Sequence, residues 1–378
     1  MQTSAPDRDT VRRLAELREQ RPVVLSLYLN LDPAEFPSPP ARATAVRSLL
    51  DEAERAVRER GDLEPRDRKA LHGSLARART FLENELSPDG AHAVALFTSE
   101  PTGLFETLKL PRPVPSQARV TRSPLVMPLA ALEQRDRWCV ALVSRREGRI
   151  LRGSPDGLRQ VATVSDDVPG QHDQGGWSQA RYQRSVDNAA LDHLRHTADV
   201  LFRHFRRRPF AQLLVGGPHE VAADFEGTLH GYLSERLAGR VDVDVENTTP
   251  EEVLAAARPC FEEAEERRER EALERLEAPE RRASGVADTL AALNERRVET
   301  LVLDPRFSAA GSECPACGWV GPEDAESCPV DGTPTERVDD VKEPAVELTL
   351  QQDAGVLVLR RTEGGLAARG GIAALLRF

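Results

Sequence analysis

The chain has 378 residues, 40% of them hydrophobic and 30% charged, which is the balance of a globular protein with two or three domains. No stretch approaches the roughly 20 consecutive apolar residues of a membrane-spanning helix, so we expect no membrane partner. The formal net charge of −11 excludes indiscriminate binding to nucleic acid, so an RNA-binding role requires a local basic face. The N-terminus carries no basic region followed by an apolar run, so we expect a cytoplasmic protein.

The first segment, residues 1–128, is predicted to be an α/β domain. Its patterns predict helices over 9–20, 41–60 and 65–86, and strands over 23–31 and 91–97. Pro111, Pro113 and Pro115 mark a linker, which places the end of this domain shortly after them.

The second segment, residues 129–255, is predicted to be a mixed-sheet α/β domain. Strands are expected over 138–143, 148–151, 160–164 and 211–215. Between the last two, a polar loop leads into a long helix over 179–207, whose apolar residues step by three or four positions. Strands followed by alternating helices and strands indicate a layered α/β fold.

The third segment, residues 256–378, is predicted to be a further α/β domain. A helix over 250–282 leads into it, and its almost wholly charged stretch 262–270 is expected to lie in solvent. A helix over 285–296, a strand over 298–303, a cysteine cluster and an apolar C-terminus follow.

The loop before the long helix combines glycines with cationic side chains. Gly175 and Gly176 permit backbone angles closed to other residues and let a partner approach closely. The following helix start offers N–H groups to phosphate or an oxyanion, and Arg181 and Arg184 add donors on one helical face. Residues 171–210 contain seven arginines and four carboxylates, which gives a local excess of three positive charges. This is the basic face that an acidic RNA-binding protein needs, although a plain turn before an arginine-rich helix has the same composition.

The order of residues in this loop resembles a known signature. Gly-Gly-Trp-Ser-Gln-Ala-Arg-Tyr, starting at Gly175, is similar to the Gly-Gly-Gln-Ser-x-x-Arg-Phe motif of archaeal-eukaryotic class-1 release factors. In that family the loop enters the peptidyl transferase centre, and its glutamine helps water attack the peptidyl-tRNA ester. Trp177 stands here in place of that glutamine.

A second resemblance offers a replacement for the missing glutamine. Gly176 to Gln179 resembles the looser Gly-x-x-Gln motif of release-factor-like peptidyl-tRNA hydrolases, and a carboxamide can orient a water molecule. The two resemblances together imply Gly175, Gly176 and Gln179 as catalytic residues. They imply RNA contacts by Trp177, Ser178, Arg181 and Arg184.

Three of the five cysteines cluster within fifteen positions, which in a reducing cytosol indicates a metal rather than a disulfide. Cys314 and Cys317 form half of a zinc-ribbon knuckle, and Cys328 begins the second half. Asp331 stands where a fourth cysteine is usual, and zinc accepts carboxylate oxygen. The sequence predicts a structural zinc ribbon over 311–335, because four protein ligands leave no open position for water. The alternative is a ribbon that has lost its metal.

The release-factor resemblance extends to the end of the chain, since some members carry a zinc ribbon within a Pelota-type C-terminal domain. It implies a multidomain α/β protein with a mixed-sheet central domain and a Pelota-type α/β C-terminal domain. It implies the ribosome, rRNA and peptidyl-tRNA as partners, with delivery by a translational GTPase left open. Peptidyl-tRNA hydrolysis in ribosome rescue or quality control is the first hypothesis. A non-catalytic ribosome-binding factor, for hibernation or occupancy, is the second, and an RNA-processing adaptor away from the ribosome is the third.

Overall fold

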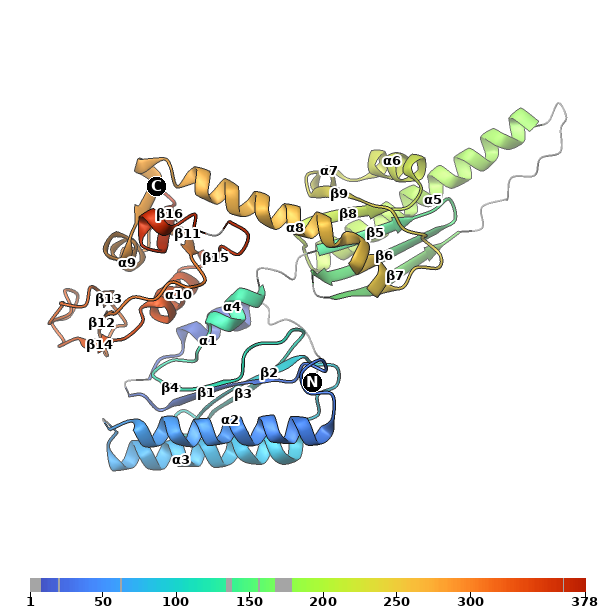
Figure 1. Cartoon of the computed structure of the whole chain (residues 1–378). Helices are drawn as coiled ribbons and strands as arrows, with labels where there is room; N and C mark the ends of the chain where they lie inside the picture. Colours follow the sequence, from blue (N-terminus) through green and yellow to red (C-terminus); the bar gives the residue numbers. More distant parts are fainter. Residues whose placement is uncertain are drawn as a thin grey trace. The chain divides into compact units, whose positions relative to one another are not determined.

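The computed structural model describes residues 8–19, 21–61, 63–133, 138–155, 157–166, 179–362 and 364–378. The chain divides into two compact units, one formed by Met1–Gln134 with Arg268–Phe378 and the other by Arg135–Arg267 (Figure 1). Both units contain β-sheets covered by helices, so the prediction of a multidomain α/β protein is confirmed. Within the described ranges, no helix is both long and apolar enough to cross a membrane.

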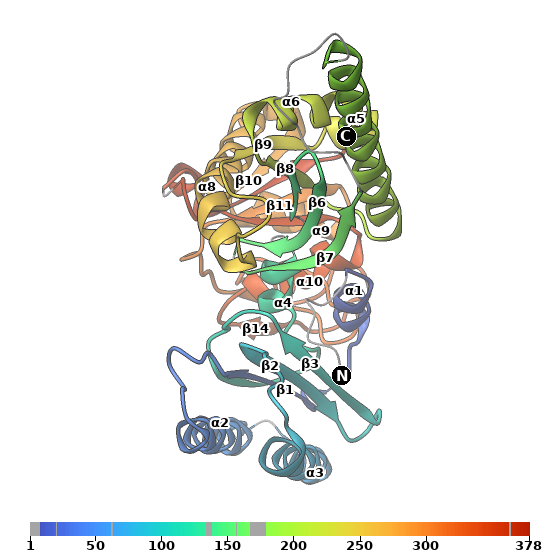
Figure 2. The same ribbon diagram turned by 90° about the vertical axis from the view of Figure 1, so that its right-hand side faces the viewer.

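The N-terminal part of the first unit is an antiparallel sheet of order β3-β2-β1-β4. Its elements are α1 (Arg8–Glu16), β1 (Val24–Asn30), α2 (Pro39–Glu59), α3 (Pro65–Thr80), a π-helix (Phe81–Glu85), β2 (Ala93–Ser99), β3 (Leu104–Leu110), β4 (Gln117–Thr121) and α4 (Met127–Glu133). Helices α2 and α3 cover one face of this sheet (Figure 2). Leu25, Leu27 and Leu29 of β1 pack with those helices, whereas Tyr28 packs in the core of the opposite face. Burial on both faces explains the continuous apolar run of β1.

The C-terminal part of the first unit is a second sheet, of order β10-β16-β11-β15, in which only β11 and β15 are parallel. Its elements are β10 (Arg282–Ser284), α9 (Val286–Asn294), β11 (Val298–Leu303), α10 (Lys342–Gln351), β15 (Gly355–Val358) and β16 (Ile372–Leu376). A small three-stranded sheet is inserted between β11 and α10. It contains β12 (Gly311–Glu313), β13 (Val320–Gly321) and β14 (Glu336–Val338).

The first and last segments of the chain share one core. Val11 and Leu14 of α1 belong to the same cluster of buried side chains as Val346 and Leu350 of α10. The side-chain amide of Gln351 donates to the carbonyl oxygen of Ala15 at 2.7 Å. The two segments therefore pack as one compact unit, and the proposed domain boundaries at residues 128 and 255 stay predictions.

A buried carboxylate lies where α10 meets α4. Glu343 accepts hydrogen bonds from the backbone N–H groups of Val126 and Met127, at 2.5 and 3.1 Å. It thereby provides an acceptor for N–H groups at the start of α4 that have none within the helix. Its second oxygen is buried and has no hydrogen-bond partner in the described part of the chain. Burial raises the pKa of Glu343 to about 7.

This raised pKa predicts that the first unit is more stable at mildly acidic than at neutral pH. In the unfolded chain the pKa of Glu343 lies near 4.3, so the folded state holds the proton more tightly. The resulting stabilisation is complete below that value and is lost as the pH rises through about 7, by about 4 kcal/mol at most. Glu343→Gln, which stays neutral, is expected to reduce this dependence, while buried Glu347, whose pKa burial also raises, retains a part of it. Urea unfolding of both proteins at several pH values tests it, and parallel profiles for the two proteins contradict it.

The second unit is a mixed five-stranded sheet of order β7-β6-β5-β8-β9. Its elements are β5 (Trp138–Val143), β6 (Glu147–Ser154), β7 (Gly157–Ser165), α5 (Gln179–Arg207), β8 (Gln212–Gly216), α6 (His219–Thr228), α7 (Gly231–Ser234), β9 (Leu237–Val241) and the first part of α8 (Pro250–Arg275). Side chains of β5 alternate between the two faces. Cys139 and Ala141 pack with α5 and α6, whereas Val140 and Leu142 pack with α8. The sheet thus holds α5, with its predicted bounds confirmed, against one face.

Candidate functional site

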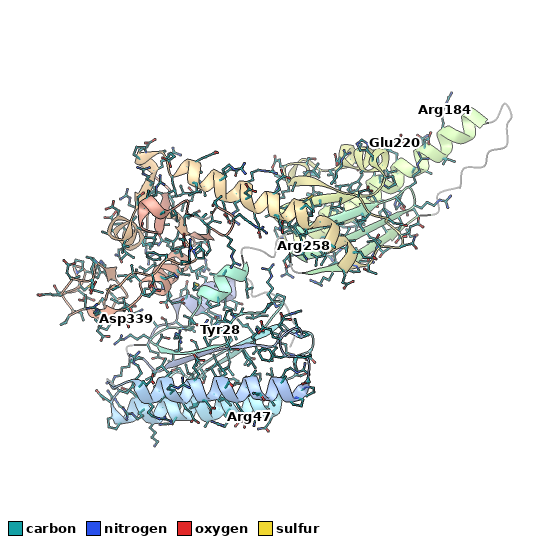
Figure 3. All side chains as sticks on the ribbon, in the orientation of Figure 1. Tyr28, Arg47, Arg184, Glu220, Arg258 and Asp339 are labelled. Carbon is teal, nitrogen blue, oxygen red and sulfur yellow. The ribbon has the colours of Figure 1, made fainter. Side chains whose placement is uncertain are left out.

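The glycine motif lies mostly outside the described residues. This applies to Gly175, Gly176, Trp177 and Ser178. Gln179 and Arg181 belong to the first turn of α5, but their side chains also lie outside the described part. Arg184 is exposed on the next turn of the helix (Figure 3). The catalytic and RNA-contact roles of these residues therefore stay predictions.

A carboxylate joins the end of β7 to α5. Asp166 accepts from His193 Nδ1 at 2.7 Å and lies 3.2 Å from His196 Nδ1, one helical turn further along. The hydrogen bond from His193, the largest contribution, lowers the pKa of Asp166. This cluster was not predicted from the sequence. Two histidines three positions apart on a predicted helix lie on the same face, so this spacing, with an aspartate before the loop, could have indicated it.

Basic side chains gather at the C-terminal end of α5. The exposed ones are Arg203, Arg206, Arg207 and Arg208, and within the described ranges none of their side chains forms an ion pair. Arg152 of β6 donates to the carbonyl oxygen of Arg208 and, at 3.2 Å, to that of Pro209. This buried guanidinium satisfies carbonyl groups after the last turn of the helix. Exposed positive charge is therefore concentrated at this end of α5, whereas the basic face predicted around the glycine loop stays a prediction.

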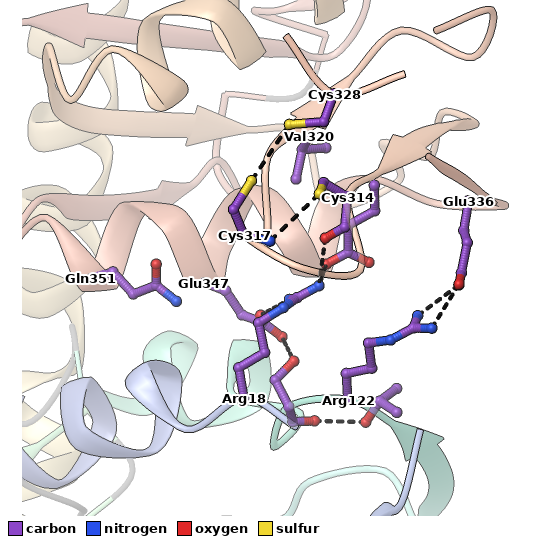
Figure 4. Close-up of polar contacts among 12 residues, drawn as sticks. Arg18, Arg122, Cys314, Cys317, Val320, Cys328, Glu336, Glu347 and Gln351 are labelled. Atoms are coloured by element: carbon purple, nitrogen blue, oxygen red, sulfur yellow. Dashed lines mark hydrogen bonds and ion pairs between the residues drawn. The ribbon is translucent and has the colours of Figure 1, made fainter. Parts of the chain in front are cut away.

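The cysteine cluster is brought together as the sequence predicts. One ligand atom from each of Cys314, Cys317, Cys328 and Asp331 lies within 4.8 Å of the others. The sulfur atoms of Cys317 and Cys328 are 3.5 Å apart (Figure 4). Asp331 lies 3.7 Å from the Cys314 sulfur. Tetrahedral zinc with bonds of about 2.3 Å to sulfur needs ligand atoms about 3.8 Å apart. The donor set and its spacing therefore fit a divalent metal of this type.

Two tight turns bring these four side chains together. The N–H of Gly318 donates to the carbonyl oxygen of Cys314, and the N–H of Gly332 donates to that of Cys328, at 3.0 and 2.9 Å. Both glycines have positive φ, 77° and 75°, which glycine adopts at little cost. The N–H of Thr333 lowers the pKa of Asp331 to about 2, so this carboxylate is ionised at neutral pH, as a metal ligand must be.

Arginines of the N-terminal part hold this insert. Arg18 donates to the carbonyl oxygen of Cys314 at 3.2 Å and pairs with Glu313 at 2.7 Å (Figure 4). Arg122 forms two hydrogen bonds with Glu336 of β14, at 2.7 and 2.8 Å. The two turns that carry the cysteines are thus tied to the first segment of the chain, a contact that the sequence did not predict.

Known proteins similar to this chain are release factors and Pelota. Residues 124–262 match the family described as bacterial archaeo-eukaryotic release factor family 10. The peptide chain release factor subunit 1 of Methanopyrus kandleri is 29% identical over 205 residues, which cover 50% of this chain and 48% of the relative. The chain thus spans about half the length of that relative.

Other similarities are longer but weaker. Peptide chain release factor subunit 1 of Thermococcus sibiricus is 24% identical over 355 residues, covering 82% of this chain and 85% of that protein. Archaeal Pelota, from a ribosome-bound model with ABCE1, aligns with a TM-score of 0.42 and 18% identity over 76% of this chain and 77% of its own. Residues 124–262 are therefore similar to bacterial archaeo-eukaryotic release factor family 10, and longer parts of the chain are similar to archaeal peptide chain release factor subunit 1.

Proposed function

We propose that this protein acts on the ribosome and hydrolyses peptidyl-tRNA, in ribosome rescue or quality control. One observation carries the proposal: the range 124–262 that matches a release factor family encloses the motif from Gly175 to Arg181. The relatives named peptide chain release factors support the same class of reaction. Cleavage of a nascent chain from tRNA is hydrolysis of an ester.

In the proposed reaction, water attacks the ester carbonyl carbon, the bond to the ribose oxygen breaks, and that oxygen takes up the proton. Gln179 orients the water, because a carboxamide donates and accepts hydrogen bonds at once. Gly175 and Gly176 let the backbone approach the ester closely. RNA contacts come from Trp177, Ser178, Arg181 and Arg184.

Release of labelled peptide from purified ribosome-bound peptidyl-tRNA tests this proposal. Gln179→Ala is expected to lower the release rate on the order of 100-fold, the usual contribution of a group that positions a reacting water, while ribosome binding is kept. Asn188→Ala is a matched control, since it removes an exposed amide from the same helix. Equal release by wild type and Gln179→Ala contradicts the catalytic role of Gln179.

A non-catalytic ribosome-binding factor, for hibernation or occupancy, is the second candidate. Trp177 at the position of the family's catalytic glutamine favours it, because an indole cannot accept a hydrogen bond from water but stacks well on a nucleobase. In that case wild type releases no peptide, and Trp177→Ala weakens co-sedimentation with ribosomes. A protein that neither releases peptide nor co-sediments acts away from the ribosome, as an RNA-processing adaptor does.

The cysteine cluster has a structural part in this proposal. Three thiolates and one carboxylate are a chemically sound zinc set, and four protein ligands leave no position for a reacting water. Zinc there holds the ribbon 311–335 and, through Arg18, its contact with the segment that follows α1.

A further inference from the structure

A stack of three rings reaches the surface of the second unit beside the end of α5. The ring centroids of Phe202 and His230 are 4.3 Å apart with planes inclined by 11°, and those of His230 and Tyr232 are 5.2 Å apart at 15°. Tyr232 is 58% exposed in a chain of which only 4% is aromatic. One face of its ring lies toward His230, and the described part of the chain places no other ring against it. Tyrosine is enriched at interfaces, because its ring offers a large apolar face and its hydroxyl can stay in water.

The backbone that carries the outer ring is fixed by hydrogen bonds, and the ring itself stacks on His230. The guanidinium of Arg236 lies 4.9 Å from the centre of the Phe205 ring and donates to the carbonyl oxygen of Tyr232 at 2.6 Å. The N–H of Tyr232 donates to His230 Nδ1 at 3.4 Å. A ring held by its neighbours loses little freedom when a partner stacks on it, so more of the contact energy appears as affinity.

Positive charge surrounds the stack. Residues 199–208 and 229–236 contain five arginines and two carboxylates, an excess of three positive charges in a chain that is −11 overall. Arg206 stands four positions after Phe202 and therefore lies beside it on the helix surface. Of the carboxylates, Glu235 lies 3.9 Å from Arg236, and Asp199 forms no ion pair among the described residues.

We propose that this ring–arginine surface, made of Phe202, Arg206, His230, Tyr232 and Arg236, binds an unpaired stretch of RNA. A base stacks on Tyr232, and the arginines pair with the phosphates on either side. An acidic protein segment pairs with arginines but does not require a flat exposed ring, so the combination favours RNA. Since α5 has 29 residues, the surface lies about 40 Å from the start of the helix and forms a second contact, separate from the glycine motif.

Binding of a labelled single-stranded oligouridylate of about 12 nucleotides, measured by fluorescence anisotropy without ribosomes, tests the proposal. Tyr232→Ala is expected to raise Kd about 5- to 100-fold, the loss of one base stacked on an aromatic ring, whereas Tyr232→Phe keeps wild-type affinity. Arg206→Ala is expected to weaken binding and to reduce the slope of log Kd against log salt by about one. Arg258→Ala is the matched control, an exposed arginine on α8 at the other face of the sheet.

Three outcomes overturn the proposal: wild-type affinity in Tyr232→Ala, equal loss in Tyr232→Phe and Tyr232→Ala, or a Tyr232-independent preference for polyglutamate over RNA. The last identifies a docking surface for an acidic protein. Because the assay contains no ribosome and no peptidyl-tRNA, its result is independent of whether Gln179 supports peptide release.

Discussion

Replacing Cys328 by serine is expected to abolish stoichiometric zinc binding and to unfold the ribbon 311–335. Cys328 is a buried ligand that closes the second turn of the cluster, and its sulfur lies 3.5 Å from that of Cys317. Even the loss of an outer hydrogen-bond partner costs a metal site about 10- to 100-fold in affinity, so the loss of a ligand costs more. In small zinc-binding elements, metal binding contributes about 10–16 kcal/mol to the free energy of folding. This far exceeds the stabilisation that three strands of two or three residues provide.

The metal content of purified protein and its thermal unfolding with and without a chelator measure this effect. Cys260→Ser is the control, because this half-buried thiol lies in the second unit, outside the cluster. Asp331→Cys tests the fourth ligand: a full thiolate set is expected to raise zinc affinity, and Asp331→Ala to lower it. Wild-type protein without zinc after growth in zinc-supplemented medium, unfolding at the same temperature as Cys328→Ser, contradicts the structural role.

Elements that are buried on both faces were predictable from local sequence. The strand over 138–143 has its predicted bounds, because a continuous apolar run of six residues has few other stable settings. The meeting of Cys314, Cys317, Cys328 and Asp331 was predictable for a similar reason. Their spacing within two short turns is a local property, and the chain needs only two glycines to bring them together.

Elements that depend on distant partners were not predictable. The linker expected around the prolines at 111–115 is followed directly by β4, which pairs with β1 almost a hundred residues earlier. The contact of Arg18 with Cys314 joins residues 296 positions apart. No pattern within either segment indicates such a contact, because the sequence around Arg18 is the same as that expected around an arginine exposed to solvent.

The charged stretch 262–270 shows the same limit inside one helix. The expectation that all of it lies in solvent is wrong at Glu269, which is 4% exposed. Its two oxygens accept from the backbone N–H groups of Arg360, Arg361 and Thr362, at 2.8, 2.8 and 2.9 Å, and from the Thr362 hydroxyl at 2.9 Å. Four donors that converge on one carboxylate fix the turn after β15 onto α8. The Glu269 carboxylate is therefore an anchor between the helix and the C-terminal sheet.

Glu269→Ala is accordingly expected to destabilise the first unit by about 2–4 kcal/mol, since charge-assisted hydrogen bonds contribute about 1.5–3 kcal/mol each and do not add fully. Glu269→Gln keeps one acceptor and is expected to cost about half as much. Chemical denaturation measures the total, and hydrogen exchange at the amides of residues 360–362 should accelerate in the alanine variant. Glu274→Ala, an exposed carboxylate in the last turn of α8, is the control and should change stability by less than about 0.5 kcal/mol. Exchange that stays slow in Glu269→Ala means that the turn is held by the packing of Gly365 against Leu273 instead, where a β-carbon on the glycine would come within 2.6 Å of the leucine.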